Sequence, residues 1–205
     1  MINLGNIELS KMYLGSTEVQ KAYLGTEQIY PSTQPTVVPI QIVQNGNFAD
    51  GLNDWTVDTY CTAATQSVGI KLTKKKSTTR GAILYQSPSG LSKNSKYYQK
   101  VVMKKGSDTA CAGFCTSSFT VSSNVQMFSD VTADWDTLDQ ITSPTGSANK
   151  ICLRVGSSSS ATGVNAYFKS FMVIDLTAMY GAGNEPSLSE CRTLFPNDYY
   201  PYNVQ

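Results

Sequence analysis

The sequence predicts an all-β protein whose main domain is a β-sandwich of the jelly-roll type. Between residues 40 and 174, short segments rich in β-branched and aromatic residues recur at close intervals, separated by Gly, Ser, Asn and Pro. Almost no helical periodicity of apolar residues accompanies them. This spacing is typical of packed antiparallel sheets and argues against alternating β-α units. We expect a sandwich that follows an arm of short β-hairpin repeats and precedes one short C-terminal helix.

The expected strands and boundaries follow from these segments. We expect residues 31–39 to be a proline-rich linker, 40–180 the sandwich domain, and 181–205 a helix and aromatic tail packed on the domain or a neighbour. The serine-rich residues 156–163 are expected to form a loop at one end of the sandwich. The expected strands are residues 40–44, 55–60, 68–73, 82–86, 97–104, 110–114, 118–121, 125–130, 138–142, 151–155 and 166–174.

A ten-residue repeat occupies the N-terminal arm, residues 1–30. Residues 6–15 and 16–25 are full copies that end in Lys-x-Tyr-Leu-Gly, and residues 26–30 are a truncated third copy. Each unit predicts strand, turn, strand, and so short a hairpin cannot bury its own apolar face. We expect an attachment and oligomerisation arm that packs on another chain, with a disordered leader as the alternative. The residues expected to make this contact are Lys11, Tyr13, Leu14, Lys21, Tyr23, Leu24, Ile29 and Tyr30.

Composition argues against several partners. A net charge of +1 with 15% charged residues lacks the basic footprint of a nucleic-acid-binding protein. The only basic run, Lys74 to Lys76, is expected to be a solvated loop tip between two strands. No stretch is long enough to predict a membrane span, and the first residues do not resemble a secretory signal. We therefore expect neither a nucleic-acid nor a membrane partner.

Cysteine and histidine usage limits the chemistry. Five cysteines without a secretory signal predict free thiols made in a reducing cytoplasm, with Cys111 and Cys115 filling a strand rather than binding metal. The complete absence of histidine removes the most frequent general base and metal ligand. Residues 45–54 are rich in oxygen ligands but lack the regular spacing of a calcium loop, so a turn cluster is expected. No metal and no cofactor are expected.

The acidic residues favour binding over catalysis. Asp134, Asp136 and Asp139 form the only dense acidic cluster, in a segment that resembles a loop leading into a strand. Glycosidases need two carboxylates on opposite sides of the bond, and no second cluster faces this one in the sequence pattern. We therefore expect no catalytic residue and no enzyme.

One helix is expected after the sandwich. Ser187 and Glu190 have the spacing of a capping box, and apolar residues from Leu188 to Phe195 fall on one helical face. Three tyrosines and two prolines follow between Phe195 and Tyr202, which makes the tail too aromatic for a free end.

Three segments resemble known families. Residues 175–187 together with residues 195–202 resemble the closing segment of many bacteriophage virion proteins, especially tail-fibre, minor-tail and head-fibre components. The N-terminal decads resemble short repeats of phage structural proteins. Residues 45–55 resemble the first strand of jelly rolls of the carbohydrate-binding-module type. The resemblance implies a virion location after synthesis in the cytoplasm of a bacterial host.

Two functions remain open from this resemblance. The first is a structural role, as a short head fibre or capsid decoration protein attached to other virion proteins by its arm and, by analogy with phage fibres, trimeric. The second is a tail-fibre or receptor-binding adhesin that recognises host surface glycans. For the second, Trp135 is the candidate stacking platform, with Asp134 and Asp136 taking sugar hydroxyls. Trp55 is expected in the core, because it follows the turn cluster into a strand.

Overall fold

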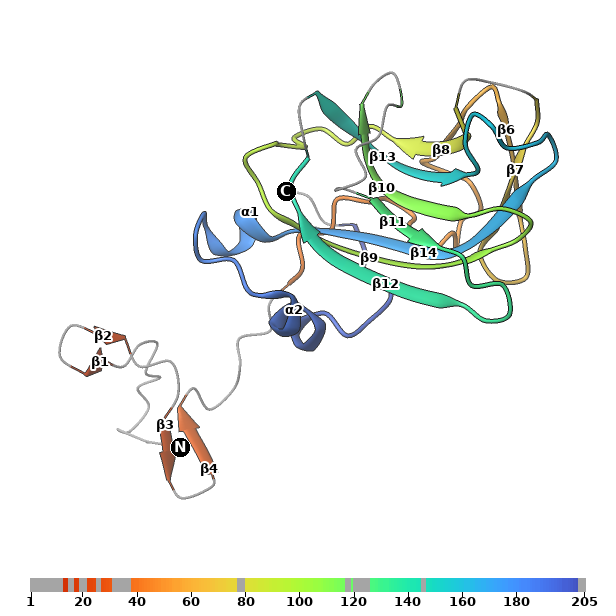
Figure 1. Ribbon diagram of the computed structural model, residues 1–205. Helices are drawn as coiled ribbons and strands as arrows, with labels where there is room; N and C mark the ends of the chain where they lie inside the picture. Colours follow the sequence, from red (N-terminus) through yellow and green to blue (C-terminus); the bar gives the residue numbers. More distant parts are fainter. Residues whose placement is uncertain are drawn as a thin grey trace. The chain divides into compact units, whose positions relative to one another are not determined.

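The computed structural model describes two units of the chain, residues 1–38 and residues 39–205, each considered by itself (Figure 1). For the strands of the first unit, only the backbone is described. The described residues are 13–14, 17–18, 22–24, 27–30, 38–76, 80–116, 119, 126–144 and 147–202.

The first unit contains two short antiparallel hairpins. Strand β1 (Tyr13–Leu14) pairs with β2 (Thr17–Glu18), and β3 (Ala22–Leu24) pairs with β4 (Glu27–Tyr30). These are the hairpins predicted around the glycines at the ends of the decads. Their strands carry the tyrosines and leucines of the expected contact, as well as Ile29, whereas Lys11 and Lys21 lie outside the described residues. The packing of this arm on another chain stays a prediction.

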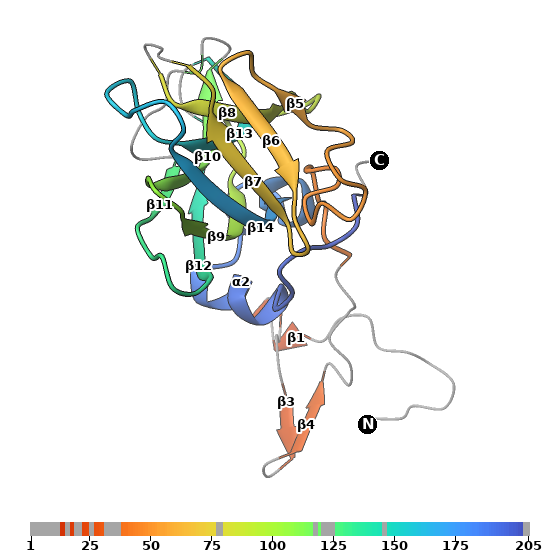
Figure 2. The same ribbon diagram turned by 90° about the vertical axis from the view of Figure 1, so that its right-hand side faces the viewer.

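The second unit is a sandwich of two five-stranded sheets (Figures 1 and 2). All pairings are antiparallel. The first sheet has the order β12 (Asp136–Thr142), β9 (Tyr97–Lys105), β14 (Asn165–Asp175), β7 (Ile70–Lys74), β6 (Cys61–Thr65). The second sheet has the order β11 (Gln126–Ser129), β10 (Ala110–Thr116), β13 (Ala148–Val155), β8 (Ala82–Gln86), β5 (Thr56–Val57). The predicted fold class is therefore confirmed.

The main core lies between the two sheets, because every second residue of a strand points inward. Ile70 and Leu72 of β7 are fully buried, as are Phe168 and Phe171 of β14 on either side of a β-bulge. Phe114 of β10 approaches from the second sheet, and its ring meets that of Tyr97 edge to face at 5.4 Å. Trp55 is also in this core with 7% of its surface exposed, as predicted.

The first expected strands differ most from the structure. Residues 40–44 make only one bridge, between Gln41 and Ile174, because the Gln41 side chain takes up the backbone donors. Its Oε1 accepts hydrogen bonds from the amides of Val43 (3.2 Å) and Val173 (2.9 Å). The expected strand 55–60 shortens to β5, and β6 was not predicted. The expected strand 118–121 falls almost entirely outside the described residues.

Two short helices follow β14 where one was expected. Helix α1 (Leu176–Tyr180) begins after Asp175, whose Oδ1 accepts a hydrogen bond from the amide of Ala178 at 2.9 Å. Helix α2 (Leu188–Leu194) has the predicted capping box, in which Ser187 and Glu190 accept from each other's backbone amides. Helix α1 was not predicted, because a five-residue helix that is held in place by packing needs only a single capping residue as its local signal.

The C-terminal segment packs on the outer face of the first sheet. A second apolar cluster joins the two helices to β9 and β14 there, with the Phe195 ring stacked on Tyr98 at 5.8 Å. The ring of Tyr200 meets Phe195 edge to face at 6.2 Å. Lys100 of β9 adds hydrogen bonds to the carbonyl oxygens of Pro196 (2.9 Å) and Asn197 (3.1 Å). We call this the C-terminal cluster, made of Tyr98, Met172, Ile174, Leu176, Cys191 and Phe195.

Candidate functional site

Trp135 directly precedes β12 and is half-buried. Lys104 of the neighbouring strand β9 places its Nζ 5.1 Å from the centre of the Trp135 ring and 5.5 Å from that of Tyr167 on β14. On the far side of Tyr167, Lys71 of β7 lies 5.7 Å from the same ring. We call Trp135, Lys104, Tyr167 and Lys71 the Trp135 row.

The Trp135 row runs from the residue before β12 across the three neighbouring strands β9, β14 and β7. Tyr167 is the register partner of both Lys104 and Lys71, so ammonium groups approach its ring from the strands on either side. These ammonium groups take up ring surface on which a sugar would stack. The row therefore provides cationic donors more readily than a bare aromatic platform.

The acidic cluster around Trp135 does not form a carboxylate pair. Asp134 is exposed and Asp136 is half-buried, while Asp139 points toward the C-terminal segment. Arg192 of α2 donates two hydrogen bonds of 2.8 Å to the Asp139 carboxylate, and this contact holds its pKa below the ordinary value. Asp139 therefore stays ionised and joins the sheet to α2 through its ion pair with Arg192. A general acid, by contrast, needs a raised pKa.

The oxygen-rich residues 45–54 form a turn cluster that uses its own polar groups, as predicted. The Asn45 side-chain amide donates to the carbonyl oxygens of Gly51 (3.2 Å) and Asn53 (2.9 Å), and its Oδ1 accepts from the amide of Asp50. The Asn45 carbonyl oxygen accepts from Trp55 Nε1 at 3.0 Å. Among the residues that the structure describes, no three His, Cys, Asp or Glu side chains come together as a metal site.

Aromatic rings and cations alternate at the surface beside the second sheet. The Arg80 guanidinium lies 4.4 Å from the ring centre of Phe119 and 5.2 Å from that of Tyr60. Lys76 continues the series, with its Nζ 5.4 Å from Tyr60. Arg80 also donates a 3.0 Å hydrogen bond to Asp58, which is buried.

The same series continues onto the outer face of the second sheet. Lys150 of β13 lies 4.0 Å from the ring centre of Tyr85 on β8 and 5.2 Å from that of Phe119. The rings of Tyr85 and Phe119 meet edge to face at 4.9 Å. The two contacts of Lys150 join its ammonium group to the negative faces of these rings. We call the ordered series Lys76, Tyr60, Arg80, Phe119, Lys150 and Tyr85 the cation–aromatic ladder.

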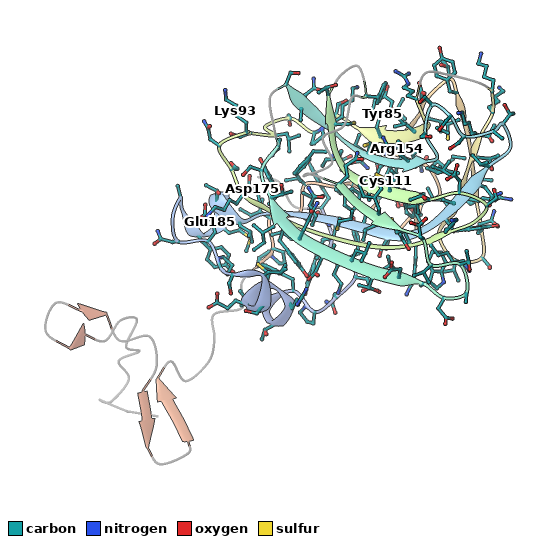
Figure 3. The ribbon with its side chains drawn as sticks, in the orientation of Figure 1. Tyr85, Lys93, Cys111, Arg154, Asp175 and Glu185 are labelled. Atoms are coloured by element: carbon teal, nitrogen blue, oxygen red, sulfur yellow. The ribbon has the colours of Figure 1, made fainter. Side chains whose placement is uncertain are left out.

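Small and apolar side chains lie under the ladder. Ile83, Cys115 and Cys152 are buried on the outer face of the second sheet, with Tyr85 and Phe119 packed against them. Figure 3 labels Tyr85, Arg154 and Cys111 on the neighbouring strands β8, β13 and β10. Arg154 lies on the same strand as Lys150, four residues further along, and its guanidinium is 6.0 Å from the ring centre of the exposed Phe128.

Sequence reasoning missed the ladder. Its members come from separate segments between residues 60 and 150, and no local spacing links them. One weak signal exists, because Lys150 and Arg154 occupy outward positions of one strand and Tyr85 an outward position of its neighbour.

Lys74 contradicts the expectation of a solvated loop tip. Its side chain is buried, and its Nζ donates hydrogen bonds of 2.7 Å to the carbonyl oxygens of Ser157 and Ser160. Backbone hydrogen bonds join Lys74 to Val164 and Gly163 as well. Lys74 ends β7 on its inward face, because the alternation that buries Ile70 and Leu72 extends to it. Only Lys75 and Lys76 of the basic run are exposed.

All five cysteines are free and buried. Burial raises the pKa of the Cys61 and Cys111 thiols to about 12 and that of Cys191 to about 11. A neutral thiol is a poor nucleophile and a poor metal ligand. The cysteines therefore act as packing groups, as predicted for Cys111 and Cys115.

Glu185 joins several parts of the segment between α1 and α2 to the sandwich. Glu185 accepts hydrogen bonds from the Thr177 hydroxyl (2.8 Å), the Gly183 amide (2.9 Å) and Lys96 Nζ (3.2 Å). These contacts, the Thr177 hydroxyl above all, lower the pKa of Glu185 to about 2. An open pocket of about 620 Å³ beside it is lined by Lys96, Ile141, Thr142, Ser143, Glu185, Pro186, Ser187 and Glu190. Its charged groups already have partners within the fold.

No helix in the described part of the chain is long and apolar enough to cross a bilayer.

Comparison with known proteins gives likenesses in shape only. No protein-family model and no curated protein matches this sequence. Among solved structures, a Family 16 Carbohydrate Binding Module-2 is 17% identical with a TM-score of 0.43, over 65% of this chain and 99% of that one. The CBM22-1 xylan-binding domain of Xyn10C from Paenibacillus barcinonensis is 14% identical with a TM-score of 0.43, over 67% and 96%.

A third similar structure is the enzymatically active domain of tailspike protein 4 from bacteriophage CBA120. It is 14% identical with a TM-score of 0.44, and the alignment covers 66% of this chain and 22% of that one. The chain therefore spans about a fifth of that domain. At these identities and TM-scores, the similarities assign neither a family nor a ligand to the chain.

Proposed function

We propose that this chain is a glycan-binding component of a bacteriophage particle, in which the sandwich contacts the surface of the host. The observation that carries the proposal is the cation–aromatic ladder. Its rings hold the ammonium and guanidinium groups in place at the surface, and these groups can donate hydrogen bonds to sugar oxygens. The phage location is supported by the resemblance of residues 175–187 and 195–202 to virion proteins.

The arrangement of the carboxylates favours binding of a glycan over its cleavage. Asp139 is held by Arg192, and Asp58 is held by Arg80. A glycosidase places two carboxyl groups on either side of one bond. Asp134 and Asp136 flank Trp135 from the same stretch of chain, so they suit hydrogen bonding to hydroxyls.

A glycan array with the full-length protein tests this function. We expect binding by the wild type, a loss of about tenfold or more in affinity for Tyr85→Ala, and unchanged folding by circular dichroism. Trp135→Ala is the matched variant on the other sheet and tests the original stacking hypothesis. Absence of binding by the wild type to any glycan of the host surface would overturn the proposal.

The position on the particle is a second proposal. The N-terminal hairpins carry Tyr13, Leu14, Tyr23 and Leu24 on strands too short to bury them, which favours an attachment arm for a short head fibre or capsid decoration protein. Three arms that share these side chains suit a homotrimer. Deletion of residues 1–30 should abolish incorporation into particles, as measured by the copy number of the protein. Incorporation at the normal copy number would contradict an attachment role.

A further inference from the structure

We propose that the outer face of the second sheet binds acidic glycans, with Lys150 and Arg154 holding carboxylates on either side of Tyr85. This inference rests on the proposed glycan-binding function and adds the charge of the ligand. Its ligand class is a polysaccharide with repeated carboxylate groups.

The local charge balance is the first argument. The ladder brings together three cations, Lys76, Arg80 and Lys150, and Arg154 lies on the same sheet. Within the described ranges, Asp58 is the only carboxylate in an ion pair with any of them, through Arg80. A chain with a net charge of +1 therefore has a concentrated positive surface here. Such a surface selects anionic ligands and attracts them from a distance.

The strand geometry gives the second argument. Lys150, Cys152 and Arg154 alternate along β13, so their side chains share one face, and the two cations are about 13 Å apart along the strand. Tyr85 is the register partner of Cys152, midway between the cations. Because Cys152 is small and fully buried, it leaves the Tyr85 ring as the large group at that position.

The state of the cations gives the third argument. Arg154 is half-buried, and its guanidinium forms no ion pair with a described residue. Among the residues that the structure describes, Lys150 makes one hydrogen bond, of 3.2 Å, to the Ser87 hydroxyl. A partly buried cation without a carboxylate partner gains more from an anion than a fully solvated one, because less water screens the pair. A carboxylate that approaches this face meets two cations, Lys150 and Arg154, that have no carboxylate partner among the described residues.

A binding series with the full-length protein tests this inference. The probes are polygalacturonate, polymannuronate, hyaluronate and polysialic acid, with fully methyl-esterified polygalacturonate as the neutral match of the first. We expect at least one acidic polymer to bind, with an affinity that falls as salt rises. Lys150→Gln and Arg154→Gln should each weaken that binding about tenfold, because each removes a charged donor. Lys93→Gln, at an exposed lysine outside both the ladder and the Trp135 row, should bind as the wild type does.

The outcomes separate this inference from the proposed function. Binding of neutral glycans alone overturns the acidic ligand and leaves the glycan-binding function standing. Binding of no glycan overturns both. Wild-type affinity in both Lys150→Gln and Arg154→Gln, or equal binding of double-stranded DNA, also overturns the inference. An unchanged unfolding temperature in the two variants shows that any loss of binding comes from the surface and not from the fold.

Discussion

The two outer faces of the sandwich are covered by different kinds of side chain. On the first sheet, the C-terminal segment covers one half with an apolar cluster in which Phe195 is fully buried. On the second sheet, the described cover of the buried Ile83, Cys115 and Cys152 includes Tyr85 and Phe119, with cations stacked on both rings. The same β-alternation thus leads to a second core on one face and a charged surface on the other. The difference lies in what packs on the outward residues: the apolar C-terminal segment on the first sheet, and aromatic rings with bound cations on the second.

Strand β9 shows this difference within a single element. Its outward residues run from Tyr98 in the C-terminal cluster, through Lys100, which binds the tail, to Lys104 in the Trp135 row. One half of the first face is therefore used for stability, and the other half resembles the second face. Four substitutions test this division, beginning with the largest expected effect.

Phe195→Ala should be the most destabilising change. It opens a cavity in the C-terminal cluster and removes the stacking on Tyr98, at a cost of about 3–5 kcal/mol in the free energy of unfolding. Urea unfolding measures this cost. Tyr85→Ala on the second face is the control, and it should cost only about 1 kcal/mol, since the ring is half-buried. Equal costs would show that the two faces do not differ in the proposed way.

Lys74→Met tests the link between the two sheets, because Lys74 ends β7 and binds the loop that follows β13. We expect a loss of about 2 kcal/mol, since two carbonyl groups lose a charged donor but can partly regain water. Lys75→Met is the control, with an effect within about 0.5 kcal/mol, because Lys75 is exposed. A loss no larger than that of the control in urea unfolding would show that the buried ammonium does not hold the loop.

Glu185→Gln tests how charge contributes to the covered face. The pKa of Glu185 is about 2 in the folded protein and 4.5 for the free side chain. Its contribution to stability is therefore complete above pH 4.5 and is lost as the pH falls through 2. The unfolding temperature of the wild type should fall more steeply over this range than that of Glu185→Gln. Asp134→Asn, which changes an exposed carboxylate, should keep the slope of the wild type, and identical slopes in all three would refute the prediction.

Trp135→Ala should have the smallest effect on stability. The ring is half-buried and its described ring contact is with Lys104, so we expect a loss of at most about 1 kcal/mol. Trp55→Ala, in the core, should lose about 3–5 kcal/mol in the same urea titration. A loss of that size at Trp135 would make it a core residue and remove it from the candidate glycan contacts.

Local signals in the sequence were sufficient for several elements. The Ser187 and Glu190 capping box and the hairpins of the decads depend on residues a few positions apart, and both are present. Trp55 could be placed in the core because a turn cluster directly precedes it. The prediction for Lys74 was wrong because we ended the expected strand at residue 73 and placed all three lysines in a connecting loop. In the structure, the alternation of β7 continues to Lys74, and two carbonyl groups bind its buried ammonium.

The candidate site could not be derived in the same way. Lys76, Arg80 and Lys150 meet their rings only after the strands have paired, and pairing partners are not encoded in any short window. The short helix α1 was missed because its local signal is weak: it consists of the capping residue Asp175 alone. Trp135 was correctly expected beside a strand, but its neighbours Lys104 and Tyr167 come from other strands.

The two tryptophans lie in different environments, so their intrinsic fluorescence can report on two parts of the protein. Trp55 lies in the core with its indole nitrogen bound to a backbone carbonyl, whereas Trp135 is half-buried beside an ammonium group. An indole shielded from water emits at shorter wavelength than a hydrated one, and a water-soluble quencher reaches only the latter. Because the chain contains no other tryptophan, its fluorescence separates into an interior and a surface signal. A ligand on the Trp135 row would alter the surface signal, while loss of the core would alter the interior one.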